Sequence, residues 1–190
     1  RSDSTLRGHY PLETKLLKDI EGEHGKKIDG EILCPFFKEG GRFTIDNVHY
    51  VKYDNTLVPA GETEFAKDKT FGYTSSNMCE YIEEKTNGEY KKEDVTCISL
   101  DDIRSLNFDK IEKQLLDVDN FNKIIVNAVD YCDVKVFCVA LYRAMAKGKT
   151  YMFRTAAAIV KVIGVITSEP LLTKEKMIVK DNSSIFIVFN

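Results

Sequence analysis

Short apolar runs that alternate with helical segments constrain the fold of this chain more than any other feature. Such runs, too short for buried helices and bounded by glycine, proline or polar residues, occupy 32–37, 95–99, 124–126 and 151–153. Segments with the 3.6-residue apolar period of helices separate most of them. This alternation predicts an α/β fold with a mostly parallel, doubly wound sheet and helices on both of its faces.

Apolar spacing and end signals predict the helices. We expect them at 11–23, from Ser75 or Ser76 to about Lys85, at 101–116 as one helix or two divided at Asn107, at 132–147, and from Thr155 to about 164. In the first helix, leucine and isoleucine residues recur at helical spacing. The hydroxyl side chains named above are predicted N-caps, because their oxygens can accept hydrogen bonds from the free N–H groups of a first turn.

A β-hairpin or small meander is predicted between the α/β units, from Arg42 to Pro59. Apolar residues alternate there around two turn sequences, Asp46-Asn47 and Asp54-Asn55. The next fifteen residues, 60–74, have no periodicity and predict a loop. Loops of this length are often functional, so this segment is a candidate part of a site.

Composition excludes several classes of partner. The 190 residues suffice for one domain with a core, and a net charge of -3 gives no reason to expect nucleic acid or an anionic membrane as partner. Five dispersed cysteines without a C-x-x-C pair indicate reduced thiols, and three distant histidines give no zinc spacing. Neither a membrane-spanning run nor a signal peptide is evident, so we expect a cytoplasmic protein.

The opening loop, Arg1–Gly8, concentrates polar side chains directly before the first predicted helix. Main-chain N–H groups and the helix dipole favour a bound anion at such a position. Ligands of parallel sheets lie beyond the carboxyl ends of the strands, where Asn127 and Arg154-Thr155 are also expected. The topology therefore predicts that these three segments meet on one rim of the sheet.

Each candidate in the opening loop has a structural interpretation beside the functional one. Arg7 can hold a carboxylate or phosphate as a bidentate fork, or form a surface ion pair with Glu13. Asp3 can accept the proton of an attacking hydroxyl, or cap the following turn. Ser4 and Thr5 can donate to sugar hydroxyls and suit a turn equally well.

Four further polar positions lie outside this loop. Arg154 precedes a predicted helix start, where the helix dipole disfavours a cation unless an anion joins it. Gly40-Gly41-Arg42 is a glycine turn with a basic tip, for which a structural role is the preferred interpretation. His49 lies in the predicted hairpin, where an exposed or hydrogen-bonded imidazole is the default. Asn127 at a strand end more often satisfies backbone groups than ligands.

Common nucleotide-binding and hydrolase motifs are missing from the sequence. It contains no G-x-x-x-x-G-K-[ST] loop, no G-x-G-x-x-G after a strand and no G-x-S-x-G elbow. The residues alone therefore predict a small-ligand α/β domain with an anion-binding rim and no self-contained nucleotide site.

Several segments, taken in order, resemble the four-carbon acid sugar kinase family. They are residues 1–13, 34–37, 40–44, 48–51, 59–66, 71–76, 83–86, 126–128 and 154–157. The resemblance implies two α/β domains, of which the N-terminal one binds the sugar acid and the C-terminal one binds ATP. Phosphoryl transfer would occur in the cleft between them, normally with Mg²⁺.

The resemblance also implies roles for individual residues. Sugar-acid binding carries over to the loop residues Ser4, Thr5, Arg7 and Gly8, and to the second matching segment with Arg154 and Thr155. Our hypotheses for the chemistry are Arg7 as carboxylate anchor and Asp3 as the catalytic proton acceptor or hydroxyl orienter. No residue is assigned to a metal or to a cofactor.

The chain departs from the family at both ends. The family's first strand, with its Asp-Asp…Thr-Gly type motif, would precede Arg1, and the glycine-rich entry to the ATP domain does not follow Leu171–Thr173. We therefore expect 1–173 to be a sugar-acid-binding domain without its first strand, and 174–190 a linker toward an absent nucleotide-binding domain. On this view the chain alone is inactive and binds neither ATP nor Mg²⁺, and an exposed sheet edge favours a homodimer.

The predicted function is the substrate-binding portion of an ATP-dependent kinase for four-carbon sugar acids of the threonate, erythronate or oxo-tetronate type. The alternative is a truncated, non-catalytic remnant that acts at most as a small-ligand binding or interaction module. A nicotinamide-dependent enzyme is a third possibility, which the missing glycine fingerprint disfavours.

Overall fold

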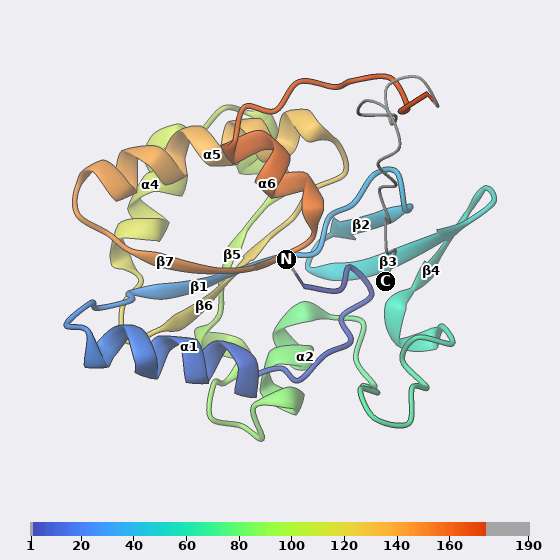
Figure 1. The fold of residues 1–190 in the computed structure, drawn as a ribbon, viewed down its shortest axis with the longest axis horizontal. Helices are drawn as coiled ribbons and strands as arrows, with labels where there is room; N and C mark the ends of the chain where they lie inside the picture. Colours follow the sequence, from blue (N-terminus) through green and yellow to red (C-terminus); the bar gives the residue numbers. More distant parts are fainter. Residues whose placement is uncertain (1, 174–190) are drawn as a thin grey trace, which may run out of the picture.

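A four-stranded parallel sheet forms the centre of the computed structural model, which describes residues 2–173 (Figure 1). Arg1 and the predicted linker 174–190 lie outside the described residues. The strand order is β5-β6-β1-β7, with β1 at Gly30–Cys34, β5 at Thr96–Ile98, β6 at Asn122–Val126 and β7 at Tyr151–Thr155. Both neighbours of β1 run parallel to it, which confirms the predicted class of sheet.

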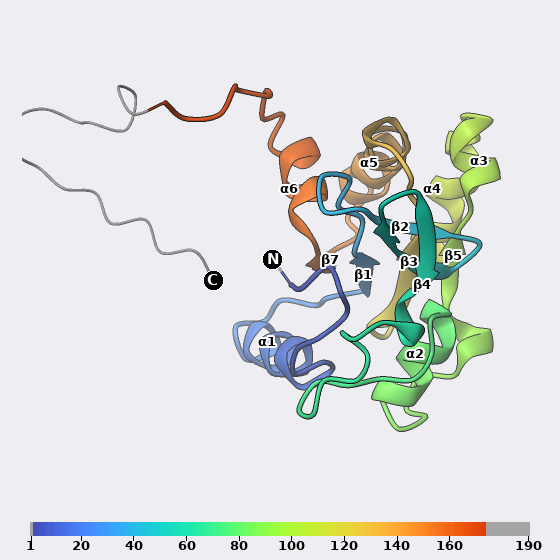
Figure 2. The same cartoon turned by 90° about the vertical axis from the view of Figure 1, so that its right-hand side faces the viewer.

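Helices cover both faces of this sheet, as predicted (Figure 2). One face carries α3 (Leu100–Arg104), α4 (Phe108–Asp117), α5 (Tyr131–Ala146) and α6 (Ala157–Ile163). The other carries α1 (Leu12–Glu23) and α2 (Met78–Lys85), together with the opening loop. Short 3₁₀ turns, η1 (Ala60–Glu62) and η2 (Lys92–Asp94), lie in the connections. Within the described residues, no helix has the length and apolar character needed to cross a membrane.

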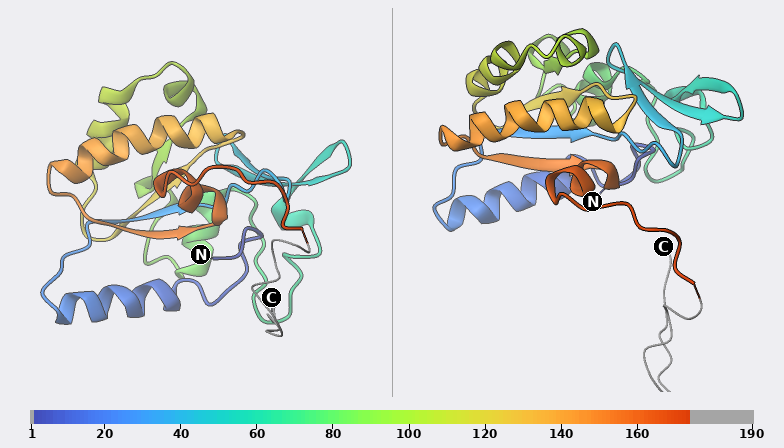
Figure 3. Two further views of the ribbon diagram at one scale, coloured as in Figure 1. Left: turned by 45° about the horizontal axis from the view of Figure 1, so that its top comes forward. Right: turned by 90° about the horizontal axis from the view of Figure 1, so that it is seen from above.

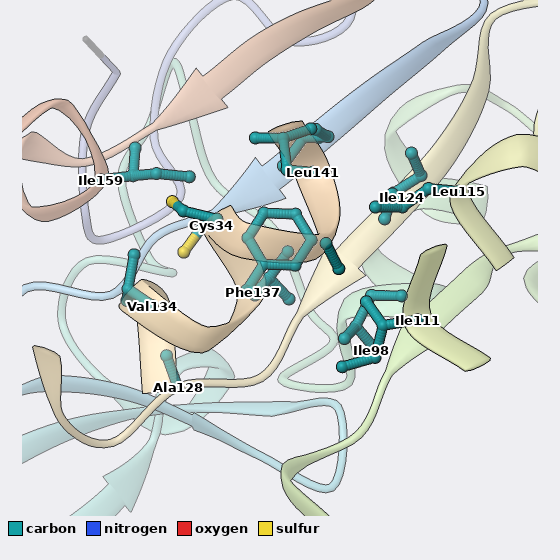
Figure 4. Packing of buried hydrophobic residues seen from close by; sticks show 14 of the residues in the cluster. Cys34, Ile98, Ile111, Leu115, Ile124, Ala128, Val134, Phe137, Leu141 and Ile159 are labelled. Atoms are coloured by element: carbon teal, nitrogen blue, oxygen red, sulfur yellow. The ribbon is translucent and has the colours of Figure 1, made fainter. Parts of the chain in front are cut away.

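The core follows from the alternation of side chains along the strands. Ile124 on β6 faces Phe137 and Leu141 of α5, in the larger apolar cluster (Figure 4). Its neighbour Ile125 faces the opposite way and belongs to the cluster with Tyr81 of α2. Burial on both faces explains why Ile124, Ile125 and Val126 form an unbroken apolar run.

The predicted meander is present as a separate antiparallel sheet of β2 (Arg42–Ile45), β3 (Val48–Tyr53) and β4 (Thr56–Pro59). Figure 3 shows it projecting from one end of the parallel sheet. Thr44 and Ala128 exchange backbone hydrogen bonds of 3.1 and 3.0 Å, which attach β2 to the rim beyond β6. The Asn127 side chain adds contacts of 2.8 Å to the backbone N–H and side chain of Asn47. The small sheet therefore lies beside the carboxyl ends of the parallel strands.

The predicted cap of α2 is wrong, although the helix itself is confirmed. Asn77 is the N-cap, and its Oδ1 accepts from the N–H groups of Cys79 at 2.9 Å and Glu80 at 3.4 Å. The hydroxyl of Ser76 accepts from the Gly61 N–H at 2.8 Å, and that of Ser75 from the N–H of Asn77 at 3.1 Å. Both serines therefore stabilise the turn before the helix.

Two further helix boundaries can be compared with the prediction. The predicted cap of α6 is wrong, and the choice between one helix and two at 101–116 is decided in favour of two. Thr155 is the last residue of β7 and caps nothing, and α6 follows Ala156 without a side-chain cap. The region 101–116 forms two helices, because Leu106 adopts a φ of +56° and interrupts the helical backbone before Asn107.

Helix α1 occupies the predicted segment but buries little of its apolar side. Leu12, Leu16 and Leu17 are all more than half exposed, and Thr14 is its buried residue. The spacing of the leucines thus predicted the helix correctly, but its exposed face is the apolar one.

Candidate functional site

The opening loop crosses the carboxyl end of β7, where the topology predicted a shared rim (Figure 1). The backbone N–H of Ser2 donates to the carbonyl oxygen of Thr155 at 2.8 Å. The guanidinium of Arg154 donates to the carbonyl of Arg7 at 3.3 Å. The structure therefore brings the two ends of the predicted site together, although they lie about 150 residues apart in sequence.

Asp3, Thr5 and Arg7 form one hydrogen-bonded network. The Asp3 carboxylate accepts from the N–H and hydroxyl of Thr5 at 2.9 and 2.8 Å, and from Nε of Arg7 at 2.8 Å. A second carboxylate, Asp68 in the long loop, lies 3.8 Å from Nη1 of Arg7. Arg7 therefore forms ion pairs, as its structural interpretation expected, but its partners are Asp3 and Asp68 instead of Glu13.

The same contacts set the protonation state of Asp3. Burial raises the pKa of this carboxyl, but hydrogen bonds from Thr5 and Arg7 outweigh burial, and the net effect lowers the pKa. Asp3 is therefore ionised at neutral pH. It caps the turn at Thr5 and can also accept a hydrogen bond from a ligand hydroxyl, but its low basicity makes it a weak proton acceptor.

Four buried side chains hold the loop from beneath, and we name them the carbonyl clamp. Four consecutive carbonyl oxygens each accept one hydrogen bond: Ser4 from His49 Nε2 at 2.8 Å, Thr5 from Tyr73 at 2.7 Å, Leu6 from Tyr81 at 2.8 Å and Arg7 from Arg154 at 3.3 Å. The donors come from β3, the long loop, α2 and β7. Because each acceptor has its own donor, the clamp fixes the backbone of the loop in one conformation.

His49 acts in this clamp as a neutral donor. Its ring is fully buried, and burial lowers its pKa to about 4. Nε2 faces the Ser4 carbonyl, while Nδ1 lies 3.0 Å from the hydroxyl of Thr44. This network assigns the proton to Nε2 and lets Thr44 donate to Nδ1. The expected hydrogen-bonded imidazole is confirmed, with a link to the site that its position in the hairpin did not reveal.

Arg154 has the anion that its position requires. Its side chain is only 2% exposed, its Nε lies 3.2 Å from Glu13 Oε1, and its guanidinium lies 4.6 Å from the centre of the Tyr10 ring. The guanidinium thus supports the opening loop from the protein interior. A direct contact between Arg154 and a substrate stays a prediction.

The remaining predicted residues shape the loop, face outward or are buried at the strand ends. Gly8 has a φ of +131°, which favours glycine, and a Cβ there would lie 3.5 Å from Arg154. Thr155 is buried at the end of β7. Ser4 is partly exposed, and its hydroxyl makes no hydrogen bond to the described residues, so it is free to meet a ligand. Asn127 is buried and satisfied by Asn47 and by the carbonyl of Ile98.

The structure adds two residues that the sequence reasoning left out of the site. The guanidinium carbons of Arg7 and Arg42 lie 5.2 and 5.3 Å from the centre of the Phe65 ring. Phe65 belongs to the long loop, which also contacts the opening loop through an edge-to-face pair of Phe71 and His9 at 4.8 Å. Two features of the sequence could have indicated these residues: the length of the loop that contains Phe65, and the basic residue Arg42 at the end of the glycine turn.

Hollows elsewhere on the surface do not compete with this site. A pocket of about 520 Å³ is lined by Tyr131 and Lys135 of α5 and by residues of α6 and the segment after it. It is mostly apolar and holds none of the predicted site residues. Among the described residues, no three His, Cys, Asp or Glu side chains gather as a metal ion would require.

An α/β domain with a polar loop on the carboxyl rim of its parallel sheet is the class of protein that the fold and the loop geometry define. A family model described as a sugar-binding N-terminal domain matches residues 1–163. The chain belongs to this family of sugar-binding N-terminal domains.

Solved structures with the same fold agree with this assignment. A Haemophilus influenzae protein of the DUF1537 family shares 16% identity at a TM-score of 0.58, over 86% of this chain and 36% of its own. A DUF1537 domain from Bordetella bronchiseptica, solved with bound citrate as a domain-swapped dimer, shares 22% identity at a TM-score of 0.55, over 85% of this chain and 34% of its own. No curated protein sequence matches the chain.

These findings confirm the resemblance to the four-carbon acid sugar kinase family, to which the DUF1537 proteins belong. The chain spans about a third of the length of these structural neighbours. The division into a domain at 1–173 and a linker at 174–190 stays a prediction.

Proposed function

We propose that this chain is the part of an ATP-dependent kinase that binds a four-carbon sugar acid of the threonate, erythronate or oxo-tetronate type. The observation that carries the proposal is the polar cluster at the opening loop. The ionised Asp3 carboxylate pairs with Arg7, the guanidinium of Arg7 shares the Phe65 ring with Arg42 of β2, and the free Ser4 hydroxyl lies in the same loop of a sugar-binding domain. The citrate in the Bordetella structure supports a carboxylate ligand.

Positioning is the chemistry that these residues can supply. Phosphoryl transfer has a loose transition state, so catalysis relies on holding the attacking hydroxyl in line and on neutralising charge. In this proposal Asp3 orients that hydroxyl by accepting its hydrogen bond, since its lowered pKa makes it a weak base. Ser4 donates to a sugar hydroxyl, whereas the Thr5 hydroxyl already donates to the Asp3 carboxylate and holds it in position. The carbonyl clamp fixes the backbone of Ser4 and Thr5.

ATP and Mg²⁺ have no fitting residues within the described chain. It contains no phosphate-binding glycine loop, and its carboxylates do not cluster as a metal site would require. In the proposal these groups are held by a nucleotide-binding domain that the family resemblance implies. A homodimer also stays a proposal, supported by the edge strands β5 and β7 and by the domain-swapped Bordetella neighbour.

Calorimetric titration with threonate, erythronate and their oxo-tetronate analogue tests the proposal. We expect saturable binding by the wild-type chain, and a loss of about tenfold to hundredfold in Asp3→Asn, because the charged acceptor at the centre of the network is removed. Asp109→Asn is the matched control, since Asp109 also pairs with an arginine, Arg143, but is almost fully exposed and lies outside the site. The Asp109→Asn variant should bind these acids with the same affinity as the wild type.

Circular dichroism on the same samples separates a folding defect from a binding defect. A folded wild-type chain that binds none of these acids would contradict the proposed substrate class. Equal affinity of folded Asp3→Asn and wild type would remove Asp3 from the site.

A further inference from the structure

Arg42 forms no ion pair with the described residues. No carboxylate among residues 2–173 lies within 4.0 Å of its guanidinium, while its Nη1 donates to the carbonyl of Gly40. Its Nε is buried without a hydrogen-bond partner in the described structure. The charge of this guanidinium can therefore form an ion pair with an anionic ligand.

Arg7, the other guanidinium on Phe65, differs in this respect. It already pairs with Asp3 at 2.8 Å and lies 3.8 Å from Asp68. Two carboxylates therefore neutralise Arg7, and a third carboxylate brought by a ligand would meet repulsion from both. Of the two arginines that share this ring, Arg42 is the one suited to an incoming anion.

The backbone around Arg42 is fixed before any ligand binds. Phe37 and Arg42 exchange hydrogen bonds of 3.0 and 2.9 Å, which close the glycine turn. Gly41 adopts a φ of +70°, where a Cβ would also approach Lys52 to 2.9 Å. The Glu64 carboxylate accepts from the Tyr53 hydroxyl at 2.6 Å and forms no ion pair with Arg42. The hydrogen bond from Tyr53 and, to a smaller extent, the charge of Arg42 lower the pKa of Glu64.

We propose that Arg42, with its guanidinium supported by the Phe65 ring, binds the carboxylate of the sugar acid, while the opening loop binds the hydroxyls. This inference rests on the proposed function and moves the carboxylate anchor from Arg7 to Arg42. The glycine turn Gly40-Gly41-Arg42, for which a structural role was preferred, then holds the arginine that binds the carboxylate. Recognition of the carboxylate at Arg42 separates sugar acids from neutral sugars of the same size.

Calorimetry with erythronate and with its uncharged amide tests Arg42. Wild type should prefer the acid, and Arg42→Met should lose about tenfold to hundredfold in acid affinity while its affinity for the amide stays unchanged. Arg42→Lys, which keeps the charge but not the planar fork, should recover part of the loss. Arg143→Met is the matched control, because Arg143 also lies over a phenylalanine ring, Phe108 at 5.1 Å, away from the site.

The outcomes separate this inference from the proposed function. If folded Arg42→Met keeps the wild-type preference for the acid, the assignment of Arg42 is overturned and the sugar-acid function stands. If wild type binds neither ligand, the proposed function fails first. A parallel loss of acid and amide affinity would show that Arg42 only supports the fold, and would also overturn the assignment.

A second inference comes from an unrelated part of the fold, a pair of neighbouring thiols. Cys79 is the second residue of α2 and Cys97 lies in the edge strand β5, and both are free and partly buried. Their sulfur atoms lie 3.4 Å apart. At this separation the thiols are in contact, and a disulfide needs only a small approach of the two side chains.

We propose that Cys79 and Cys97 are a modification site at which a hydroperoxide forms a disulfide. The Cys79 thiolate attacks one peroxide oxygen, the O–O bond breaks, and Cys79 becomes a sulfenic acid as the peroxide is reduced. Cys97 then attacks that sulfur, the S–S bond forms, and the hydroxyl leaves as water. Two thiols and one hydrogen peroxide thus yield one disulfide and two waters.

The local chemistry favours Cys79 as the attacking thiol. It lies at the N-terminal end of α2, where the helix dipole stabilises a thiolate. A hydrogen bond from the Cys97 thiol lowers the pKa of Cys79, and the same bond raises that of Cys97. Cys97 therefore suits the role of the resolving thiol.

Peroxide treatment followed by alkylation and peptide mass spectrometry tests the pair. We expect one intramolecular disulfide joining the peptides of Cys79 and Cys97, absent from Cys79→Ser and Cys97→Ser and retained in Cys132→Ser, which changes an exposed cysteine. The oxidised chain should unfold at higher urea concentration than the reduced chain. Full alkylation of both residues after peroxide, or a disulfide that involves another cysteine, would overturn the proposal.

Discussion

Replacing Glu31 with glutamine is expected to destabilise the folded chain by about 3–5 kcal/mol, because it leaves a buried ammonium without its counter-charge. Glu31 and Lys123 face each other in register on β1 and β6, with 2.7 Å between Oε2 and Nζ. Their side chains are 0% and 1% exposed. The Lys123 ammonium also lies 4.0 and 3.8 Å from the ring centres of Tyr90 and Phe121.

Lys123 has one way to limit this cost, which is to lose its proton. Burial already lowers the pKa of Lys123, while Glu31 opposes that shift by favouring the charged form. Without Glu31, burial acts unopposed and the lysine releases its proton more readily. The loss of stability caused by Glu31→Gln is therefore expected to become smaller as the pH rises from neutral and the buried lysine releases its proton.

Urea unfolding of matched variants measures the effect. Glu80→Gln is the control, since Glu80 pairs with Lys92 at 3.5 Å and both are about half exposed, where such pairs contribute about 0–1 kcal/mol. The double variant Glu31→Leu with Lys123→Met should recover most of the stability, because it removes both buried charges at once. Equal midpoints for Glu31→Gln and Glu80→Gln would show that the buried pair does not stabilise the sheet.

The sequence predicted the framework because the framework depends on local patterns. Apolar runs and helical periods gave all four parallel strands and the positions of the helices, since burial on two faces imposes those patterns directly. The cap of α2 was missed because three hydroxyl or amide residues in a row, 75–77, can each cap, and distant contacts with Gly61 decide among them. The Glu31–Lys123 pair was missed because charged residues at the start of a strand indicate exposure by default.

The sequence predicted the position of the site on the sheet but not the contacts that hold it together. The loop and β7 could be placed on one rim because parallel topology fixes where strand ends lie. The carbonyl clamp could not, because His49, Tyr73 and Tyr81 come from three separate elements and no spacing connects them to the opening loop. Which carboxylate Arg7 pairs with was likewise decided by three-dimensional proximity.

Lowering the pH from about 6.5 to about 4 is expected to weaken folding by about 3 kcal/mol through His49 alone. The unfolded chain binds a proton on this imidazole near its ordinary pKa of 6.5, whereas burial holds the folded pKa at about 4. The unfolded state therefore takes up the proton first, and stability falls with pH across this window. After burial, the charge of Arg42 is a further cause of the low folded pKa of His49, because it also disfavours an imidazolium.

Urea midpoints at several pH values between 7 and 4 measure this dependence, with His49→Gln as the test variant. Glutamine can still donate to the Ser4 carbonyl but does not titrate, so the variant should lose most of the pH slope. His24→Gln, at an exposed ring, should keep it. Carboxyls with a lowered folded pKa, such as Asp3 and Glu83, begin to lose their own stabilisation below about pH 5, so the slopes of the variants are compared between pH 7 and 5. An unchanged slope in His49→Gln would mean that His49 is not buried as a neutral donor, and the clamp would lose its link between β3 and the site.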